Sequence, residues 1–291
     1  MFSQKNDNAY LKWIELAEGA VKMRDYETAA RFYRHVAVHF GLLNDLDQMK
    51  RFTVKTGECY LNAGESLIDS RPIMALQFFI KASNCFREGR DEQKAKECDS
   101  MIERLYNSLL EDGTIRSCKD VHGLKRIGDY FASRDVGKAA ICYETAAKKA
   151  FENGKPALSG SLYGTLGECY VTLRRYEDAA RRYALSAEIY YECRELFEAA
   201  WRYCISGFYF ILAGNKREAS LMARKAESAC KEDRIDVLLN DLALICRLLS
   251  EGGISEAKKR WIKIRRKFKE SYIRIIDSCF RSVNLSEKTD G

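Results

Sequence analysis

A short pattern of alanines and aromatic residues recurs five times along this chain of 291 residues. The copies begin at Tyr26, Pro72, Val136, Tyr176 and Lys216, so successive copies start 46, 64, 40 and 40 residues apart. A period near forty residues is typical of stacked helical hairpins, in which each repeat buries its apolar side against its neighbours. The pattern therefore predicts a helical repeat protein.

The alanines of the pattern are spaced to lie on one side of a helix. In three copies a small residue recurs eight positions after the first alanine of the pair, at Ala37, Ala147 and Ala187. Positions i, i+4 and i+8 lie close to one stripe of an α-helix. Small side chains on that stripe let two helices approach to the near end of the usual packing range of about 8–10 Å. We expect these alanines to be contact points between helices.

A second pattern, a glycine followed by aromatic residues, precedes the alanine pattern. Its glycines are Gly57, Gly128, Gly167 and Gly207. A glycine inside a helix costs about 1 kcal/mol relative to alanine, so close approach of a neighbouring helix is the expected reason for its presence. Together the two patterns predict an all-α protein, an α-solenoid of antiparallel helical hairpins with a C-terminal helical cap.

Apolar periodicity places the expected helices along the whole chain. Their ranges are 8–23, 25–40, 46–66, 71–88, 90–111, 118–133, 135–153, 156–173, 176–192, 195–213, 216–231, 234–250, 254–268 and 270–283. The interval of 64 residues exceeds one period by about 24, and an extra helix near 90–111 accounts for it, followed by a loop at 112–117. We expect hairpin repeats over 1–233, a helical cap over 234–283 and a flexible tail over 284–291.

The cysteines and histidines favour packing roles over a metal site. The eleven cysteines include no C-x-x-C pair, and several replace apolar residues of the repeat, which predicts buried, reduced thiols. His35 and His39 stand four residues apart, but no acidic or cysteine partner is in register with them, so a partly exposed helix face is favoured. We therefore predict no metal and no other cofactor.

Motifs that mark catalysis are missing from the sequence. There is no P-loop, no dinucleotide-binding glycine motif, no H-E-x-x-H and no nucleophile elbow. The first eight residues lack the apolar core of a signal peptide, and the longest apolar stretch, 203–213, is too short to span a bilayer. We expect a cytoplasmic binding protein and not an enzyme.

The net positive charge of the chain is concentrated near its C-terminus. Between Ile254 and Arg281 ten Lys or Arg residues face three acids, an excess equal to the formal charge of +7 on the whole chain. The candidate partner-binding residues are the cations of this segment and two nearer the middle of the chain: Lys119, Lys125, Lys258, Lys259, Arg260, Lys263, Arg265, Arg266, Lys267 and Lys269. Trp261, Ile264, Phe268, Tyr272 and Ile275 form an opposing apolar stripe, which predicts an amphipathic helix with a basic outer face.

The repeat resembles the tetratricopeptide-like repeats. The resemblance is based on the segments Tyr26 to Tyr33 and Tyr176 to Tyr183, each with a central pair of alanines, and on Gly167 followed by Tyr170. The forty-residue spacing and the helical C-terminal end resemble those of the soluble NSF attachment proteins, of alpha or gamma type. That resemblance implies an adaptor that binds the assembled SNARE four-helix bundle, syntaxin-like helices included, and recruits an NSF-type ATPase to take the bundle apart. It also implies peripheral membrane contact through the SNAREs.

Two other functions are compatible with the same residues. A general tetratricopeptide-like scaffold for protein partners needs only the hairpins. A nucleic-acid or anionic-membrane binder would use the basic helices between 254 and 281. Nucleic acid is the less favoured ligand, because aromatic residues that could stack on bases are sparse outside the packed stripe.

Overall fold

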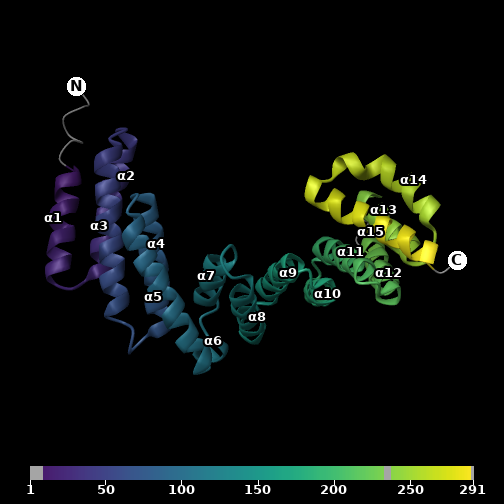
Figure 1. Cartoon of the computed structure of the whole chain (residues 1–291), viewed down its shortest axis with the longest axis horizontal. Coiled ribbons are helices and arrows are strands. Elements are labelled where there is room, and N and C mark those ends of the chain that lie inside the picture. The colour runs from purple at the N-terminus through teal and green to yellow at the C-terminus, as the bar shows by residue number, and fades with distance from the viewer. Residues whose placement is uncertain (1–8, 233–236, 290–291) are drawn as a thin grey trace. The chain divides into compact units, whose positions relative to one another are not determined.

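The computed structural model describes residues 9–232 and 237–289, with side chains described through Val283 (Figure 1). The described residues are almost all helical and include no strand. The helices are α1 (Ala9–Lys22), α2 (Tyr26–Leu42), α3 (Leu46–Glu65), α4 (Pro72–Glu88), α5 (Glu92–Glu111), α6 (Thr114–Ser117), α7 (Val121–Phe131), α8 (Val136–Glu152), α9 (Pro156–Thr172), α10 (Tyr176–Glu192), α11 (Leu196–Leu212), α12 (Lys216–Glu232), α13 (Val237–Ser250), α14 (Ile254–Ile264), the short 3-10 helix η1 (Arg265–Lys267) and α15 (Glu270–Thr289). The all-α prediction is confirmed, and within each unit most successive helices pack against one another as hairpins.

A recurring three-residue turn joins most of the helices. Its middle residue has a positive φ, as at Arg24 (59°), Arg174 (56°) and Gly214 (80°). The amide of the third residue then donates a hydrogen bond to the carbonyl five residues back, as from Asp25 to Ala20 at 2.9 Å. This hydrogen bond satisfies one of the last carbonyls of the first helix. It also turns the chain back, so that the next helix begins directly after the third residue of the turn. The same turn therefore recurs between helices in both units, although the connections from α3 to α4 and from α7 to α8 do not contain it.

The alanine pattern lies where the sequence places it, at the contacts between helices. Ala29, Ala139 and Ala179 are completely buried. A methyl group on Gly167 of α9 would lie 2.9 Å from the Tyr183 ring of α10, so this glycine allows the two helices to approach closely. The predicted role of the small residues as contact points is confirmed.

Buried serines add hydrogen bonds to three of these contacts. Ser159 of α9 donates to the Ala147 carbonyl of α8 at 2.8 Å, and Ser186 of α10 donates to the Gly160 carbonyl of α9 at 2.6 Å. Ser206 of α11 repeats the arrangement, donating to a carbonyl of α10 at 2.8 Å. A buried hydroxyl is tolerated because it has a partner, and here the partner is the backbone of the neighbouring helix.

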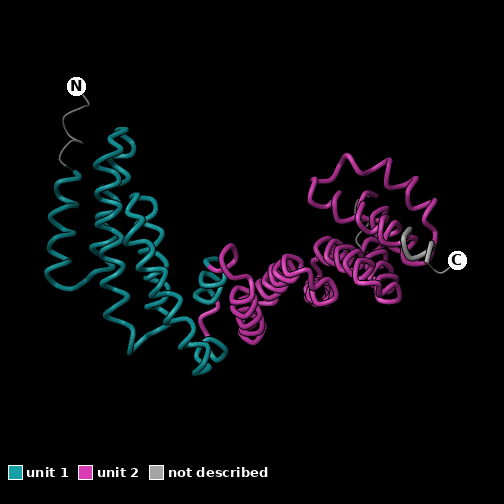
Figure 2. The backbone as a smooth tube through the Cα atoms, viewed as in Figure 1, with its two compact units in different colours: residues 1–118, 122–130 teal, residues 119–121, 131–291 magenta. Residues whose placement is uncertain are grey.

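The chain forms two compact units, coloured separately in Figure 2. Unit 1 comprises residues 1–118 and 122–130, and unit 2 comprises residues 119–121 and 131–291. In unit 1 the hairpins of α1 to α4 and the extra helix α5 share one core. The division into repeats and cap that the sequence predicts at residue 233 falls outside the described residues.

Three helix boundaries differ from the sequence-based prediction. The expected loop at 112–117 contains α6, because the Asp112 carboxylate accepts the Thr114 amide at 2.8 Å and starts a helical turn. The expected helix 254–268 ends at Ile264 and continues as η1, after which Phe268 adopts an extended backbone. The segment 284–289, expected to be a tail, continues α15 to Thr289.

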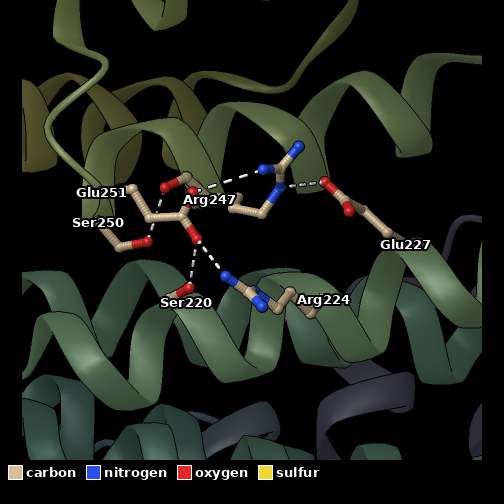
Figure 3. A network of polar contacts seen from close by, with 6 residues as sticks. All are labelled: Ser220, Arg224, Glu227, Arg247, Ser250 and Glu251. Atoms are coloured by element: carbon tan, nitrogen blue, oxygen red, sulfur yellow. Dashed lines mark hydrogen bonds and ion pairs between the residues drawn. The ribbon is translucent and has the colours of Figure 1, made fainter.

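The C-terminal helices α13, α14 and α15 close the core of unit 2. Helices α13 and α15 both pack on α11. A polar network, drawn in Figure 3, joins α12 to α13. In it the Glu251 carboxylate accepts hydrogen bonds from Ser220 at 2.8 Å and Arg224 at 3.0 Å, and Arg247 donates to Glu227 at 2.8 Å. The cap is thus fixed to the repeats by charged contacts as well as by its core.

Candidate functional site

Six of the predicted cations of α14, η1 and the start of α15 are exposed, and we call these six the basic face. They are Lys258, Lys259, Lys263, Arg266, Lys267 and Lys269. None of them forms an ion pair with any described side chain. Cations that are not paired with described side chains remain available to an acidic ligand.

Two of the predicted cations serve the fold and are not part of this face. Arg260 donates to Glu256 at 2.9 Å and pairs with Asp241 of α13 at 3.3 Å. Arg265 donates to Asp277 of α15 at 2.9 Å. These pairs join α14 and η1 to the helices behind them, so both arginines are largely used in holding the cap together.

The two other predicted residues lie elsewhere. Lys119 is exposed in the short connection between α6 and α7 and belongs to unit 2. Lys125 lies on α7 in unit 1 and pairs with Asp129 at 2.8 Å. The structure does not assign either residue to the basic face.

The apolar stripe predicted opposite the basic face is confirmed. Trp261 and Ile264 are buried, and Phe268, Tyr272 and Ile275 pack against the core of unit 2. The Trp261 indole donates a hydrogen bond to Asp277 at 2.7 Å, so its polar atom is satisfied as well.

A cavity of about 220 Å³ lies between the repeats and α15 in unit 2. Its lining residues come from four helices: Glu168 from α9, Tyr183 from α10, Trp201, Arg202, Ile205 and Tyr209 from α11, and Ser271, Tyr272 and Ile275 from α15. The lining combines aromatic surface with one cation and one acid. Such a mixture of apolar walls and few polar groups is typical of a ligand site.

Arg202 is the unusual residue of this cavity. Its guanidinium lies over Gly164 of α9, where a methyl group would approach Nη1 to 2.7 Å, and 5.9 Å from the centre of the Tyr183 ring. Its Nε is buried without a hydrogen-bond partner among the described residues, and no described carboxylate lies within 4 Å. This half-buried arginine thus forms no contact ion pair with a described residue, and Glu168 of the same cavity acts on it only from beyond that distance.

Besides Arg202, Glu168 is the one lining residue of this cavity that is charged at neutral pH. The Glu168 residue is exposed, but the protein atoms around its carboxyl partly desolvate it, which raises its pKa. The positive charge of Arg202 opposes that rise. Burial also raises the pKa of Tyr183 and of Tyr209, so both phenols are neutral hydroxyls at neutral pH.

Two residues of the basic face are sequence neighbours of a residue that stacks on the wall of this cavity. The Trp201 ring stacks on Phe268 at a centroid distance of 6.3 Å and meets Tyr272 edge-on at 4.8 Å. Phe268 stands in the sequence between Lys267 and Lys269, two residues of the basic face. The segment after η1 therefore places the backbone of these two lysines next to the residue that stacks on Trp201.

The sequence pattern points to the basic residues but not to the cavity. Its lining residues are separated by long stretches of chain, and only the packing of α15 on α11 unites them. One sequence feature could have indicated the site. Gly164 stands between Gly160 and Gly167, and three glycines on one helix indicate that side chains of neighbouring helices approach its backbone closely.

His35, His39 and most of the cysteines have packing roles in the structure. His39 stacks on Tyr10 at 5.4 Å and His35 lies 5.6 Å from Trp13, which fixes α1 on α2. Nine of the eleven cysteines are buried, and all eleven are free thiols. Within residues 9–232 and 237–283, no cluster of three His, Cys, Asp or Glu side chains is arranged to hold a metal ion. No helix in the same ranges is both long and apolar enough to cross a membrane.

Comparison with known proteins adds little to this description. No family model and no curated protein matches the chain. BtubC (BKLC) from P. vanneervenii has a similar structure, with a TM-score of 0.38 and 17% identity over 83% of this chain and 92% of that one. Aspartyl phosphate phosphatase F from Bacillus subtilis has a TM-score of 0.43 and 14% identity over 95% of this chain and 69% of that one. Similarities this weak carry no argument about function, so the fold assignment rests on the helices themselves.

Proposed function

We propose that this protein is a helical-repeat scaffold that binds an acidic segment of a partner protein along its basic face. The observation that supports this most directly is the set of six exposed cations in α14, η1 and the start of α15 that form no ion pair with a described side chain. A cluster of one charge sign accelerates encounter with an oppositely charged surface and favours it over other surfaces.

The resemblance of the repeat to the soluble NSF attachment proteins suggests one particular partner. In this form of the proposal the acidic segment belongs to an assembled SNARE four-helix bundle, and the bound scaffold recruits an NSF-type ATPase. The basic face suits such a partner because a helical bundle presents rows of side chains that a rigid helix edge can follow. Membrane contact would then be peripheral, through the SNAREs.

A binding experiment with two defined probes tests the proposal. The probes are a purified SNARE four-helix bundle and a fluorescent, C-amidated peptide of Glu and Leu residues, each titrated with the full chain at low and at higher salt. The variant Lys258→Glu/Lys263→Glu/Lys267→Glu reverses half of the basic face. We expect its affinity to fall by roughly tenfold or more, with a weaker dependence on salt.

The matched control reverses the same number of charges on other exposed helices of unit 2, in the variant Lys148→Glu/Lys216→Glu/Lys231→Glu. We expect the control to bind almost as the parent chain does. Binding of neither probe, or equal effects of the two triple variants, would refute the proposal.

Two further outcomes decide its details. Binding of the bundle without ATP-dependent disassembly in the presence of an NSF-type ATPase would remove the adaptor role and leave the scaffold. Tighter binding to a single-stranded RNA or to anionic vesicles than to both protein probes would replace the acidic segment with a phosphate-rich ligand.

A further inference from the structure

We propose that the cavity around Arg202 recognises a carboxylate that the partner protein carries beside an apolar side chain. This inference rests on the protein-binding function proposed above and names the chemistry that one site would read. Neither the repeat pattern nor the basic run of the sequence points to this cavity.

The missing partner of Arg202 is the first reason for this inference. Other arginines of unit 2 that contact neighbouring helices have acidic partners, as Arg247 has in Glu227 and Arg265 has in Asp277. Arg202 forms no ion pair within 4 Å with any described residue, Glu168 interacts with it only at longer range, and its Nε is shielded from water as well. A carboxylate entering the cavity would accept charge-assisted hydrogen bonds from this guanidinium.

A second cavity of unit 2 gives a useful contrast. It is lined by Glu188, Tyr191, Glu192, Tyr203, Lys225 and Ser228. There the cation is already neutralised, because Lys225 pairs with Glu188 at 2.8 Å. That cavity therefore lacks an unpaired cation that an anionic ligand could satisfy.

The remaining lining residues restrict which anion fits. Arg202 is the one cation among the residues that line the cavity, and Glu168 stands at its rim with a negative charge. A single charge on the ligand can be balanced by Arg202, whereas the second charge of a phosphate would face Glu168 without a counterion. A carboxylate is thus the better match.

The walls of the cavity favour an apolar group next to that carboxylate. Trp201, Tyr209, Tyr272 and two isoleucines supply most of the lining, and the volume of about 220 Å³ accommodates one medium-sized side chain. Because Trp201 stacks on Phe268, the wall adjoins Lys267 and Lys269. An acidic segment held by the basic face would therefore lie close enough to place one carboxylate in the cavity.

Two small molecules of the same shape, one charged and one neutral, test the site directly. The probes are 3-phenylpropionate and its neutral isostere 3-phenylpropionamide, and their binding to the full chain is measured by ligand-observed NMR. Arg202 predicts that the carboxylate binds roughly tenfold more tightly than the amide. The variant Arg202→Gln should abolish that preference, and Lys225→Gln is the matched control that should retain it.

A second variant keeps the charge and moves it. In Gly164→Ala the new methyl would lie 2.7 Å from Nη1 of Arg202, and the flexible end of the arginine can shift to make room. We expect this variant to fold normally, as checked by circular dichroism, and to lose most of the preference for the carboxylate. It keeps the inference testable if Arg202→Gln proves unstable.

The outcomes separate this inference from the proposed function. Equal binding of carboxylate and amide, a preference that survives Arg202→Gln, or tighter binding of phenyl phosphate would each overturn the carboxylate site. If the fragment preference depends on Arg202 but the acidic peptide does not bind, the proposed function fails and the site stands. The carboxylate could come from a Glu or Asp side chain or from the C-terminus of the partner. Binding of peptides with an internal Glu and an amidated end, compared with neutral peptides that end in a free carboxylate, distinguishes these two sources.

Discussion

The close contact at Gly207 gives a sharp test of how the C-terminal helices are held. Gly207 lies in the middle of α11, and a methyl group there would lie 2.5 Å from the Cys246 sulfur of α13 and 3.3 Å from the Ala219 carbonyl oxygen of α12. The first distance is about 1 Å inside an ordinary contact, and Cys246 is completely buried. The variant Gly207→Ala therefore has to displace two helices that already form part of one core.

The magnitude follows from two opposing effects. Replacing a glycine in the interior of a helix by alanine stabilises the helix by about 1 kcal/mol. Overpacking a buried contact costs about 1–3 kcal/mol, and here the upper part of that range applies because one obstacle is backbone. We expect Gly207→Ala to lose about 1–2 kcal/mol of unfolding free energy, which for a unit of this size lowers Tm by about 2–8 °C.

Thermal and urea unfolding, followed by far-UV circular dichroism, measure the effect, and two companion variants control it. Gly19→Ala adds the same methyl to α1 with no atom within 4 Å, so it should stabilise the protein by up to about 1 kcal/mol. Cys246→Ala removes the obstructing sulfur, so combining it with Gly207→Ala should recover part of the loss. A Gly207→Ala variant as stable as the parent chain would show that α11, α12 and α13 do not pack as described.

Two further predictions concern titration and reactivity. Hydrogen bonds from Ser220 and then Arg224 lower the pKa of Glu251 below its ordinary value of 4.5, so its contribution to stability is complete above that pH and is lost as the pH falls through the lowered value. Glu251→Gln should lower the unfolding free energy by about 0.2–1 kcal/mol at pH 7, since the contacts of Glu251 with Ser220 and Arg224 are partly exposed, and by almost nothing in strong acid. Urea unfolding measures both values, and an equal loss at the two pH values would contradict this prediction. A thiol reagent should label Cys118 and Cys193 rapidly in the native protein, because the other nine cysteines are buried, and equally fast labelling of all eleven would be incompatible with the core.

The sequence by itself determined the fold class and the contacts inside the hairpins. The period of the alanine pattern, the glycines that precede it and the prolines at Pro72 and Pro156, which begin α4 and α9, all act within one or two neighbouring helices. Helix geometry converts such spacing directly into a buried face, so no long-range information is needed. The amphipathic character of the basic segment was predictable for the same reason.

Only the tertiary structure decided which polar residues remain available to a ligand. Arg260 and Arg265 look like their neighbours in the sequence, yet Asp241 and Asp277 pair with them. Arg202 has no comparable partner among the described residues, although nothing in its local sequence distinguishes it. Partners of this kind stand on helices far along the chain, and pairing depends on how whole helices pack. Local periodicity predicts which face of a helix is buried, but it contains no information about which charges on other helices will meet that face.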